Sequence, residues 1–320
     1  MTLHLTRISN RYTLQVSDRL VSGGVQDPLA NKNLIYWARG ALVTIAYAGL
    51  AYGLSLSNRD MPTDEWLAET LRGHPIPRGP DGIEPVTFGI QKIPRWLDIG
   101  QSIQLLRDEL QKSLDRVPSS HRHQAFELII AGWQETRQRG FTPITANVVK
   151  PKGNAPVVVE RPARNWHLRG RIGLIATPNG YLTESEMSDF GRTLPMASPD
   201  IVENFLVERI RTVSCRYPEY VGPHCMSILL PPPSVAPIRV RFIPNVTHTA
   251  VFQTAEITRE IGVAFSPWVV GPNMFTAPSI MVGPGELQMG PHKIVLDAPA
   301  PEKGIRGYFG SLRRPKGPKT

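Results

Sequence analysis

Cysteine is nearly absent from this chain, and its scarcity removes two classes of protein at the outset. The 320 residues include only two cysteines, Cys215 and Cys225. Two cysteines cannot form a disulfide framework, and these two lack the paired spacing of a zinc motif. His121 and His123 do not supply a site either, because alternate residues on a helix diverge and no third ligand follows closely. We therefore expect no bound metal and no other cofactor.

The sequence also lacks the apolar segments that mark secreted and membrane proteins. Residues 1–20 alternate and carry charges, so they do not form the short apolar core of a signal peptide. Residues 40–58 carry no charge, but Tyr47, Gly49, Gly53 and several hydroxyl groups interrupt them. That pattern favours a buried strand followed by a turn and a helix over a membrane span. We expect a cytoplasmic protein with no membrane partner.

Acidic residues are outnumbered, and the formal net charge is +9 at pH 7. Much of the excess lies in residues 301–320, which also contain Gly and Pro and have little to bury, so we expect a basic disordered tail. Its cationic residues are Lys303, Arg306, Arg313, Arg314, Lys316 and Lys319. Such a tail can bind nucleic acid by releasing counterions. A solubilising role is the simpler interpretation, and nucleic acid is the weaker partner hypothesis.

The order of predicted elements indicates an α+β fold. Helices are expected from Thr63, around 103–117, and from Ser198 with proline at the first helical position. Strands are expected at 125–150 and 226–230, besides the N-terminal hairpins. This order fits a helix–sheet–sheet–helix sandwich over residues 1–230. Residues 231–300, which follow a triple proline, predict a β-rich C-terminal extension that caps a sheet edge.

The first fifty residues bring four chemically useful groups together. Alternating residues around Ser9–Arg11 predict a hairpin in which pairing numbers sum to about 20, so Thr2 should face Asp18. A second hairpin, hinged at residues 39–40 with a pairing sum of about 79, should set Lys32 opposite Tyr47, just before Gly49. In both hairpins the polar residues lie at the open end. If the hairpins are neighbours, these groups converge.

These groups are the parts of a hydrolase whose nucleophile is its own first residue. Removal of Met1, which a small second residue permits, would give Thr2 a free α-amine with an ordinary pKa of about 7.7–8.0. That amine suits a general base for the weakly nucleophilic hydroxyl. Lys32 would keep the local potential positive, and Asp18 would orient it. The backbone amide of Gly49 could stabilise an oxyanion, since no side chain blocks the approach.

The same residues resemble a known family. Residues 2–71 look like the start of a proteasome β-type subunit or its simpler bacterial ring-protease relative, an N-terminal-nucleophile hydrolase. Residues 16–19 (VSDR) resemble the strand end with the acidic residue, 31–33 (NKN) the lysine segment, and 47–51 (YAGLA) the oxyanion glycine turn. Residues 128–133 with 143–144 are similar to a later hairpin. The resemblance implies a four-layer αββα sandwich over 1–230 and a bacterial homo-oligomer.

The sequence departs from the family pattern at two places. Family members carry a Gly-Ser-Gly turn whose serine holds the N-terminal amine, but residues 176–180 here read ATPNG. They also carry an Asp-x-Tyr-Ser-Gly segment, where residues 218–222 read PEYVG. Two functions therefore stay open. One is a threonine hydrolase that cleaves peptide or small amide bonds through Thr2, Asp18, Lys32 and Gly49. The alternative is a catalytically inactive protein of the same fold that acts as a structural or interaction module.

Overall fold

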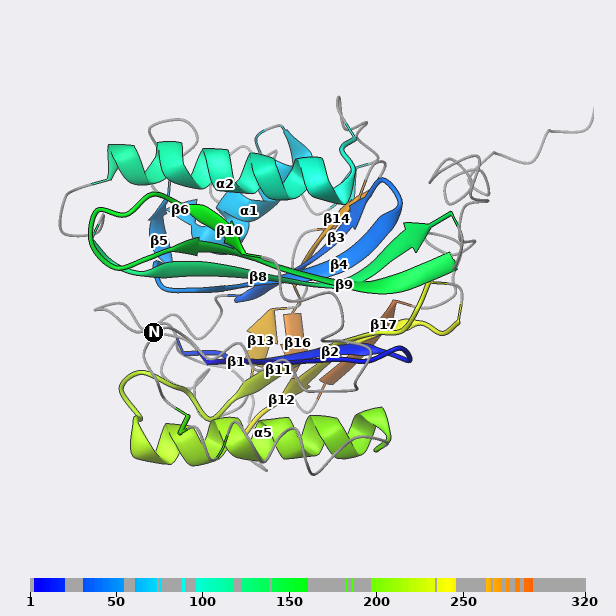
Figure 1. Ribbon diagram of the computed structural model, residues 1–320. Coiled ribbons are helices and arrows are strands. Elements are labelled where there is room, and N and C mark those ends of the chain that lie inside the picture. Colours follow the sequence, from blue (N-terminus) through cyan, green and yellow to red (C-terminus); the bar gives the residue numbers. More distant parts are fainter. Residues whose placement is uncertain are drawn as a thin grey trace, which may run out of the picture.

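The chain folds around two β-sheets that lie face to face (Figure 1). The computed structural model describes residues 3–20, 31–54, 61–73, 75, 88–89, 96–117, 123–137, 140–160, 182–183, 186, 197–233, 235–245, 263–265, 267–271, 274–276, 280–282 and 285–289. Several predictions made above concern Thr2, His121, residues 176–180 and residues 301–320. All of these positions lie outside the described residues.

A five-stranded sheet carries the N-terminal hairpin at one edge, in the order β1-β2-β11-β12-β17. Its strands are β1 His4–Ile8, β2 Thr13–Asp18, β11 Cys225–Leu230, β12 Ile238–Ile243 and β17 Gly285–Met289. Every neighbouring pair is antiparallel. The strand predicted at 226–230 is confirmed as β11. β11 pairs with β2, so this late part of the chain lies directly beside the N-terminal hairpin.

The β1–β2 hairpin has a register one residue away from the predicted one. His4 pairs with Ser17 and Ile8 with Thr13, so pairing numbers sum to 21 and Leu3, not Thr2, lies opposite Asp18. The cause is the turn. Ser9 pairs with Tyr12 through a 3.0 Å backbone bond, and the Ser9 hydroxyl accepts from the amides of Arg11 and Tyr12. The loop therefore has two central residues instead of a single centre at Asn10.

The second sheet has eight strands in the order β10-β9-β8-β4-β3-β14-β15-β7. Its strands are β3 Asn33–Ala38, β4 Ala41–Ala48, β7 Phe88–Gly89, β8 Phe126–Thr136, β9 Gly140–Lys150, β10 Val158–Glu160, β14 Trp268–Gly271 and β15 Met274–Thr276. The two strands predicted within 125–150 are confirmed as β8 and β9. Two short two-stranded sheets, β5 Tyr52–Leu54 with β6 Met61–Pro62 and β13 Val263–Phe265 with β16 Ile280–Val282, complete the described strands.

The β3–β4 hairpin has the predicted register. Asn33 pairs with Ala46 and Ala38 with Ala41, and the amide of Tyr47 donates to the carbonyl of Lys32 at 3.1 Å. Gly40 in the turn has φ of 72°, a backbone conformation that glycine adopts without a Cβ clash. The pairing sum of 79 is therefore confirmed. It fixes Lys32 one strand away from the chain that leads into Gly49.

Three α-helices occur among the described residues: α1 Thr63–Arg72, α2 Ile99–Arg116 and α5 Pro199–Arg216. All three helices were predicted from sequence, although Thr63 does not cap α1. Pro62 occupies the cap position, and the Thr63 hydroxyl instead donates to the carbonyl of Leu50 at 2.7 Å. Asp98 caps α2 through a reciprocal capping box with Gln101. None of these helices is long and apolar enough to cross a membrane.

Three apolar clusters hold the layers together. One packs α1 and α2 on the outer face of the eight-stranded sheet, and a second packs α5 on the outer face of the five-stranded sheet (Figure 1). The third lies between the sheets and includes Trp37, Trp133, Ile228 and Phe242. Its burial joins the two sheets, because apolar area removed from water contributes about 25 cal/mol per Å². At the end of this interface nearest the N-terminus of the chain, the buried side chains are polar instead.

Strands from the C-terminal third lie within both sheets. β14 pairs in parallel with β3, and β17 pairs with β12. These strands come from the segment predicted to be a β-rich extension, and they extend two sheets begun by earlier parts of the chain. The division of the chain at residues 230 and 300 stays a prediction.

The predicted four-layer αββα sandwich is wrong, because the described residues form a sheet-rich α+β fold with three helices. Five strands spaced about 4.8 Å apart span about 19 Å, whereas one helix with its side chains is about 10–12 Å wide. Among the described residues, α5 is the one long helix on this sheet, and it covers only part of the sheet's width. On the eight-stranded sheet, α1 and α2 together are narrower than the strands beneath them.

Candidate functional site

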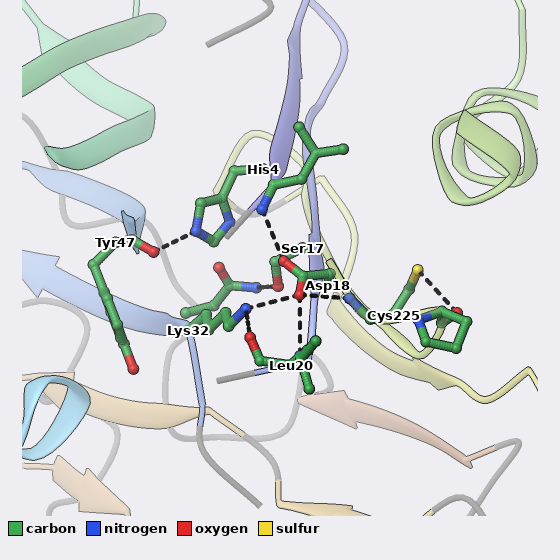
Figure 2. Close-up of polar contacts among 11 residues, drawn as sticks. His4, Ser17, Asp18, Leu20, Lys32, Tyr47 and Cys225 are labelled. Carbon is green, nitrogen blue, oxygen red and sulfur yellow. Dashed lines mark hydrogen bonds and ion pairs between the residues drawn. The ribbon is translucent and has the colours of Figure 1, made fainter. Parts of the chain in front are cut away.

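The open ends of the two hairpins meet at an ion pair. Lys32 Nζ lies 2.8 Å from Asp18 Oδ2, and the two side chains are 1% and 0% exposed. Lys32 precedes β3 in one sheet, and Asp18 ends β2 in the other, so the pair connects the sheets at their polar end. The convergence of Asp18 and Lys32 that the sequence suggested is present in the structure. Figure 2 shows the pair and its neighbours.

The Asp18 carboxylate is held by donors from four places in the chain. Its Oδ1 accepts from the amide of Leu3 at 2.8 Å. Its Oδ2 accepts from Lys32, from the amide of Leu20 at 3.0 Å and from the amide of Gly222 at 3.1 Å. An ionised carboxylate has only acceptors, and charge-assisted bonds of this kind are the stronger ones. Asp18 is therefore a fixed anchor for Lys32 and for the backbone at Leu3.

Lys32 is a buried ammonium group with a restrained position. Besides the bond to Asp18, its Nζ donates to the carbonyl of Leu20. Burial lowers the pKa of Lys32, and the charge of Asp18 opposes that shift. An ammonium group has three donors, and these two contacts use two of them. The activating role predicted for Lys32 stays a prediction.

Gly49 lies just beyond β4, in a place that no other residue fits. Its φ is 114°, and a Cβ there would lie 2.4 Å from the carbonyl oxygen of Ala125 and 3.0 Å from Phe126 Cα. Strand β8 thus passes close to the backbone at this point. The need for glycine is local packing and backbone conformation. A role for the Gly49 amide as an oxyanion donor stays a prediction.

Thr2 lies outside the described residues, and its role as nucleophile stays a prediction. The residue that follows it is tightly placed. Leu3 is fully buried, its amide donates to Asp18, and its carbonyl accepts from the amide of Asp18 at 3.2 Å. The chain therefore reaches the Asp18–Lys32 pair one peptide bond after Thr2.

Sequence reasoning missed His4, which is completely buried on β1. Its Nε2 lies 2.5 Å from the carbonyl oxygen of Tyr47 on β4, so the imidazole joins the two sheets (Figure 2). Asn33 and Ser17 make a second such link, through a 2.8 Å bond from Nδ2 to Oγ. The signal for His4 was present in the alternation of β1, because residues two apart share a face and Thr2 precedes His4 by two.

Gly222 is a second group that the sequence did not reveal. The 218–222 segment lacks the family serine, yet its glycine amide reaches Asp18 from the loop after α5. A Cβ at Gly222 would lie 2.8 Å from Leu20 Cβ. Glu219 in the same segment is exposed. The loop therefore supports the carboxylate through backbone, which a side-chain motif cannot indicate.

The cysteines do not add a second reactive centre to the described site. Cys225 is buried beside Asp18 in the sheet register, and Cys215 is exposed; both are free thiols. Burial raises the pKa of the Cys225 thiol, and the Asp18 charge raises it further. The thiol form is therefore favoured, which makes Cys225 a poor nucleophile. Within the described ranges, no group of three or more His, Cys, Asp or Glu side chains is arranged to hold a metal.

Comparison with known proteins finds similarity in the overall fold. No protein-family model matches the chain, and no curated protein matches it. Among the similar solved structures are two Anbu proteins. Anbu (ancestral beta-subunit) from Yersinia bercovieri has 12% sequence identity and a TM-score of 0.44, covering 72% of this chain and 82% of its own. The Anbu (Gly-1) mutant from Hyphomicrobium sp. strain MC1 has 11% identity and a TM-score of 0.42, with the same coverages. The similarity concerns a proteasome-like fold at most.

Proposed function

We propose that the chain is a hydrolase that cleaves amide bonds with Thr2 as an N-terminal nucleophile exposed by removal of Met1. The observation that carries the proposal is the buried Lys32–Asp18 ion pair, at 2.8 Å, beside the backbone of Leu3. A buried ion pair is costly to build, since desolvation offsets much of the attraction. Its position one residue from a potential N-terminal nucleophile favours a chemical role for it.

The chemistry follows from the roles of these groups. The Thr2 α-amine takes the hydroxyl proton while the oxygen attacks the substrate carbonyl, and the Gly49 amide stabilises the negative charge that develops on the carbonyl oxygen. The amine then returns the proton to the leaving nitrogen, so the amide C–N bond breaks and a threonyl ester forms. Water hydrolyses the ester to a carboxylic acid. The positive charge of Lys32 keeps the α-amine deprotonated and eases the attack.

The test is covalent labelling by a peptide epoxyketone, an electrophile that requires a hydroxyl and a free amine on one residue. We expect loss of Met1 and one adduct per chain by intact mass. Thr2→Ala, whose small second residue also permits Met1 removal, should give none. Lys32→Met should slow labelling strongly while leaving Thr2 in place. A wild-type chain with a free Thr2 and no adduct would count against the proposal.

The alternative is an inactive protein of the same fold that works as an interaction module. The observation in its favour is the absence of serine from residues 218–222, where the chain reaches Asp18 only through the Gly222 amide. This alternative predicts a retained Met1 or an unreactive Thr2 in the labelling experiment. Assembly into a homo-oligomer, a cytoplasmic location and nucleic-acid binding by residues 301–320 remain hypotheses for either function. Light scattering of the purified chain tests the first.

A further inference from the structure

Glu127 is a buried carboxyl group that the proposed mechanism does not use. It lies near the start of β8, and only 7% of its surface is exposed. Its neighbours Phe126 and Leu128 pack in the apolar cluster beneath α1 and α2, so Glu127 faces the other side of the sheet. An ionised carboxylate is almost never buried to this extent without a cation. The charge that acts on Glu127 is the negative charge of Glu160.

Asn147 and Glu160 lie on the same face of the next two strands. Asn147 pairs with Ile129 on β8, two residues from Glu127, and with Glu160 on the edge strand β10. Residues that pair across antiparallel strands share a face, so the three polar side chains form a row that ends at the sheet edge. Within this row, Asn147 Nδ2 donates to Glu127 Oε1 at 3.0 Å.

The oxygen of the Asn147 amide indicates where a proton lies. Oδ1 is buried and accepts no hydrogen bond from any residue that the structure describes. Such an acceptor has lost its bond to water without replacement, which is rare in folded proteins. A carboxylic acid supplies the missing donor: while its Oε1 accepts from Nδ2, its protonated Oε2 can donate to Oδ1. An ionised carboxylate cannot do this, because both of its oxygens only accept.

The environment of Glu127 favours the protonated form. Burial, helped by the Glu160 charge, raises the pKa of Glu127 to about 7. The bond from Asn147 Nδ2 alone acts in the opposite direction, because it stabilises the ionised form. A bond from Oε2 to Oδ1 exists only in the protonated form and stabilises that form. Below pH 7, the carboxyl group is therefore neutral in the folded chain.

The other titratable groups close to β8 do not supply a cation for Glu127. On the strands that pack against β8 they are, besides Glu160, His4, Arg7, Asp18, Tyr47 and Lys150. Arg7, Tyr47 and Lys150 lie on the outer faces of the two sheets. Asp18 is paired with Lys32, and His4 is neutral near pH 7 because burial lowers its pKa to about 4.

We propose that Glu127 and Asn147 form a protonated carboxyl–amide pair that clamps the edge strand β10, and that loss of the proton releases this strand. β10 has three residues and pairs with β9 alone among the described strands. When the proton passes to solvent, Oε2 and Oδ1 face each other as two acceptors, and Glu127 and Glu160 repel each other across Asn147. The amide of Val157 still donates to Gln111 on α2 at 2.9 Å, so β10 opens from its Glu160 end. The device is independent of the proposed hydrolase function.

Hydrogen exchange of the backbone amides that join β9 and β10 tests the clamp. Exchange is followed residue by residue by NMR at about pH 5.5 and about pH 8.5, on either side of the titration, and is expressed as protection factors. We expect the protection of β10 to fall at least about tenfold at the higher pH, the effect of losing one hydrogen bond. β10 should then exchange faster than the amides that pair β4 with β8, as a local opening requires. Unchanged protection of β10, or exchange only together with the β4–β8 amides, overturns the inference.

Three variants separate the proton from the charge. Glu127→Gln keeps two possible bonds to Asn147 and has no charge at any pH, so β10 should keep its protection at about pH 8.5. Glu160→Gln removes the repelling charge, so the fall in protection should be smaller than in wild type. Glu135→Gln is the matched control, because burial also raises the pKa of Glu135 but this residue lies near the other end of β8. A fall in Glu127→Gln as large as that in wild type contradicts the clamp.

A titration of the wild-type chain tests the pair directly and does not depend on how well the variants fold. The ¹³C resonance of the Glu127 carboxyl group should titrate with a midpoint of about 7. The ¹³C resonance of the Asn147 side-chain carbonyl should move with the same midpoint, because Oδ1 loses its donor when Glu127 ionises. An Asn147 carbonyl resonance that stays constant through the Glu127 titration overturns the inference.

Discussion

The amide nitrogen of Gly222 lies 3.1 Å from Asp18 Oδ2, although the two residues are 204 positions apart in sequence. This bond joins the loop after α5 to the end of the first hairpin. It makes the carboxylate of Asp18 a meeting point of the N-terminus, the Lys32 segment and the 218–222 loop. The geometry of the candidate site therefore depends on a part of the chain that contributes no reactive side chain.

Gly222→Ala should disturb this meeting point. Its Cβ would lie 2.8 Å from Leu20 Cβ and 3.1 Å from the Leu20 amide nitrogen, so the loop must move away from Asp18. We expect a loss of about 1–3 kcal/mol in unfolding free energy, as in other overpacked sites, and slower epoxyketone labelling. Gly100→Ala is the control, since the nearest atom there is the Asp98 carboxylate at 3.3 Å. Equal stability of the two variants in urea denaturation would contradict the contact.

Asp18→Asn should leave the buried Lys32 ammonium without its counter-charge. Breaking a buried pair from one side costs about 3–5 kcal/mol, because the remaining charge is uncompensated. We expect a loss of that order in urea denaturation near pH 7. The exposed pair of Lys112 and Glu109, at 2.7 Å, provides a control: Glu109→Gln should change the urea midpoint very little. The double variant Asp18→Asn with Lys32→Met should be more stable than Asp18→Asn alone. A double variant no more stable than the single one would argue against a charged Lys32.

Gly49→Ala should destabilise the protein more than an alanine in an ordinary glycine turn. The substituted residue would keep φ near 114° and press its Cβ against the Ala125 carbonyl at 2.4 Å. Backbone strain of this type costs about 1–3 kcal/mol, and the clash adds to it. Gly140→Ala is the matched control, because its φ is 65° and no heavy atom lies within 4 Å of the added Cβ. Thermal unfolding of both variants gives the comparison, and a larger loss at Gly140 would refute the close approach of β8.

Glu127 on β8 should make stability fall as pH rises. Burial, helped by the Glu160 charge, raises the pKa of Glu127 from 4.5 to about 7. A carboxyl whose folded pKa is raised binds its proton more strongly in the folded chain. Its stabilisation is complete below about pH 4.5 and is lost as pH rises through about 7, by an amount on the order of 3 kcal/mol.

Glu127→Gln measures that contribution. The variant should show a flatter dependence of unfolding free energy on pH between about 4.5 and 7, and greater stability than wild type above pH 7. Glu219→Gln, at an exposed position, should leave the profile unchanged. His4 acts in the opposite direction. Its pKa is lowered from 6.5 to about 4, so its contribution is present above pH 6.5 and is lost as pH falls toward 4. Parallel profiles for Glu127→Gln and wild type would contradict the raised pKa.

Local sequence patterns predicted the elements well and their exact pairing less well. The β3–β4 register followed from Gly40, whose positive φ marks the turn centre. The β1–β2 register was one residue off, because the Ser9 side chain closes a turn with two central residues and nothing in the alternation distinguishes that turn from one centred on Asn10. The error moved Leu3 to the position predicted for Thr2.

The same distinction applies to the candidate site, where some contacts could be predicted from sequence and others could not. Asp18 ends β2 and Lys32 immediately precedes β3, and the alternation of both hairpins is readable, so their approach could be predicted from sequence. Gly222 and His4 make contacts between distant segments, and although the alternation of β1 indicates the face of His4, neither partner can be read from the local sequence. The balance of helix and sheet was also a long-range property, since β14 and β17 widen sheets that the N-terminal half begins.

In the proposed mechanism, Thr2 is the first residue of the mature chain and its nucleophile. The most direct measurement is tandem mass spectrometry of the N-terminal peptide after treatment with a peptide epoxyketone. We expect a peptide that begins at Thr2 and carries the adduct on that residue. A peptide that begins at Met1, or one that begins at an unmodified Thr2 after full treatment, would contradict it.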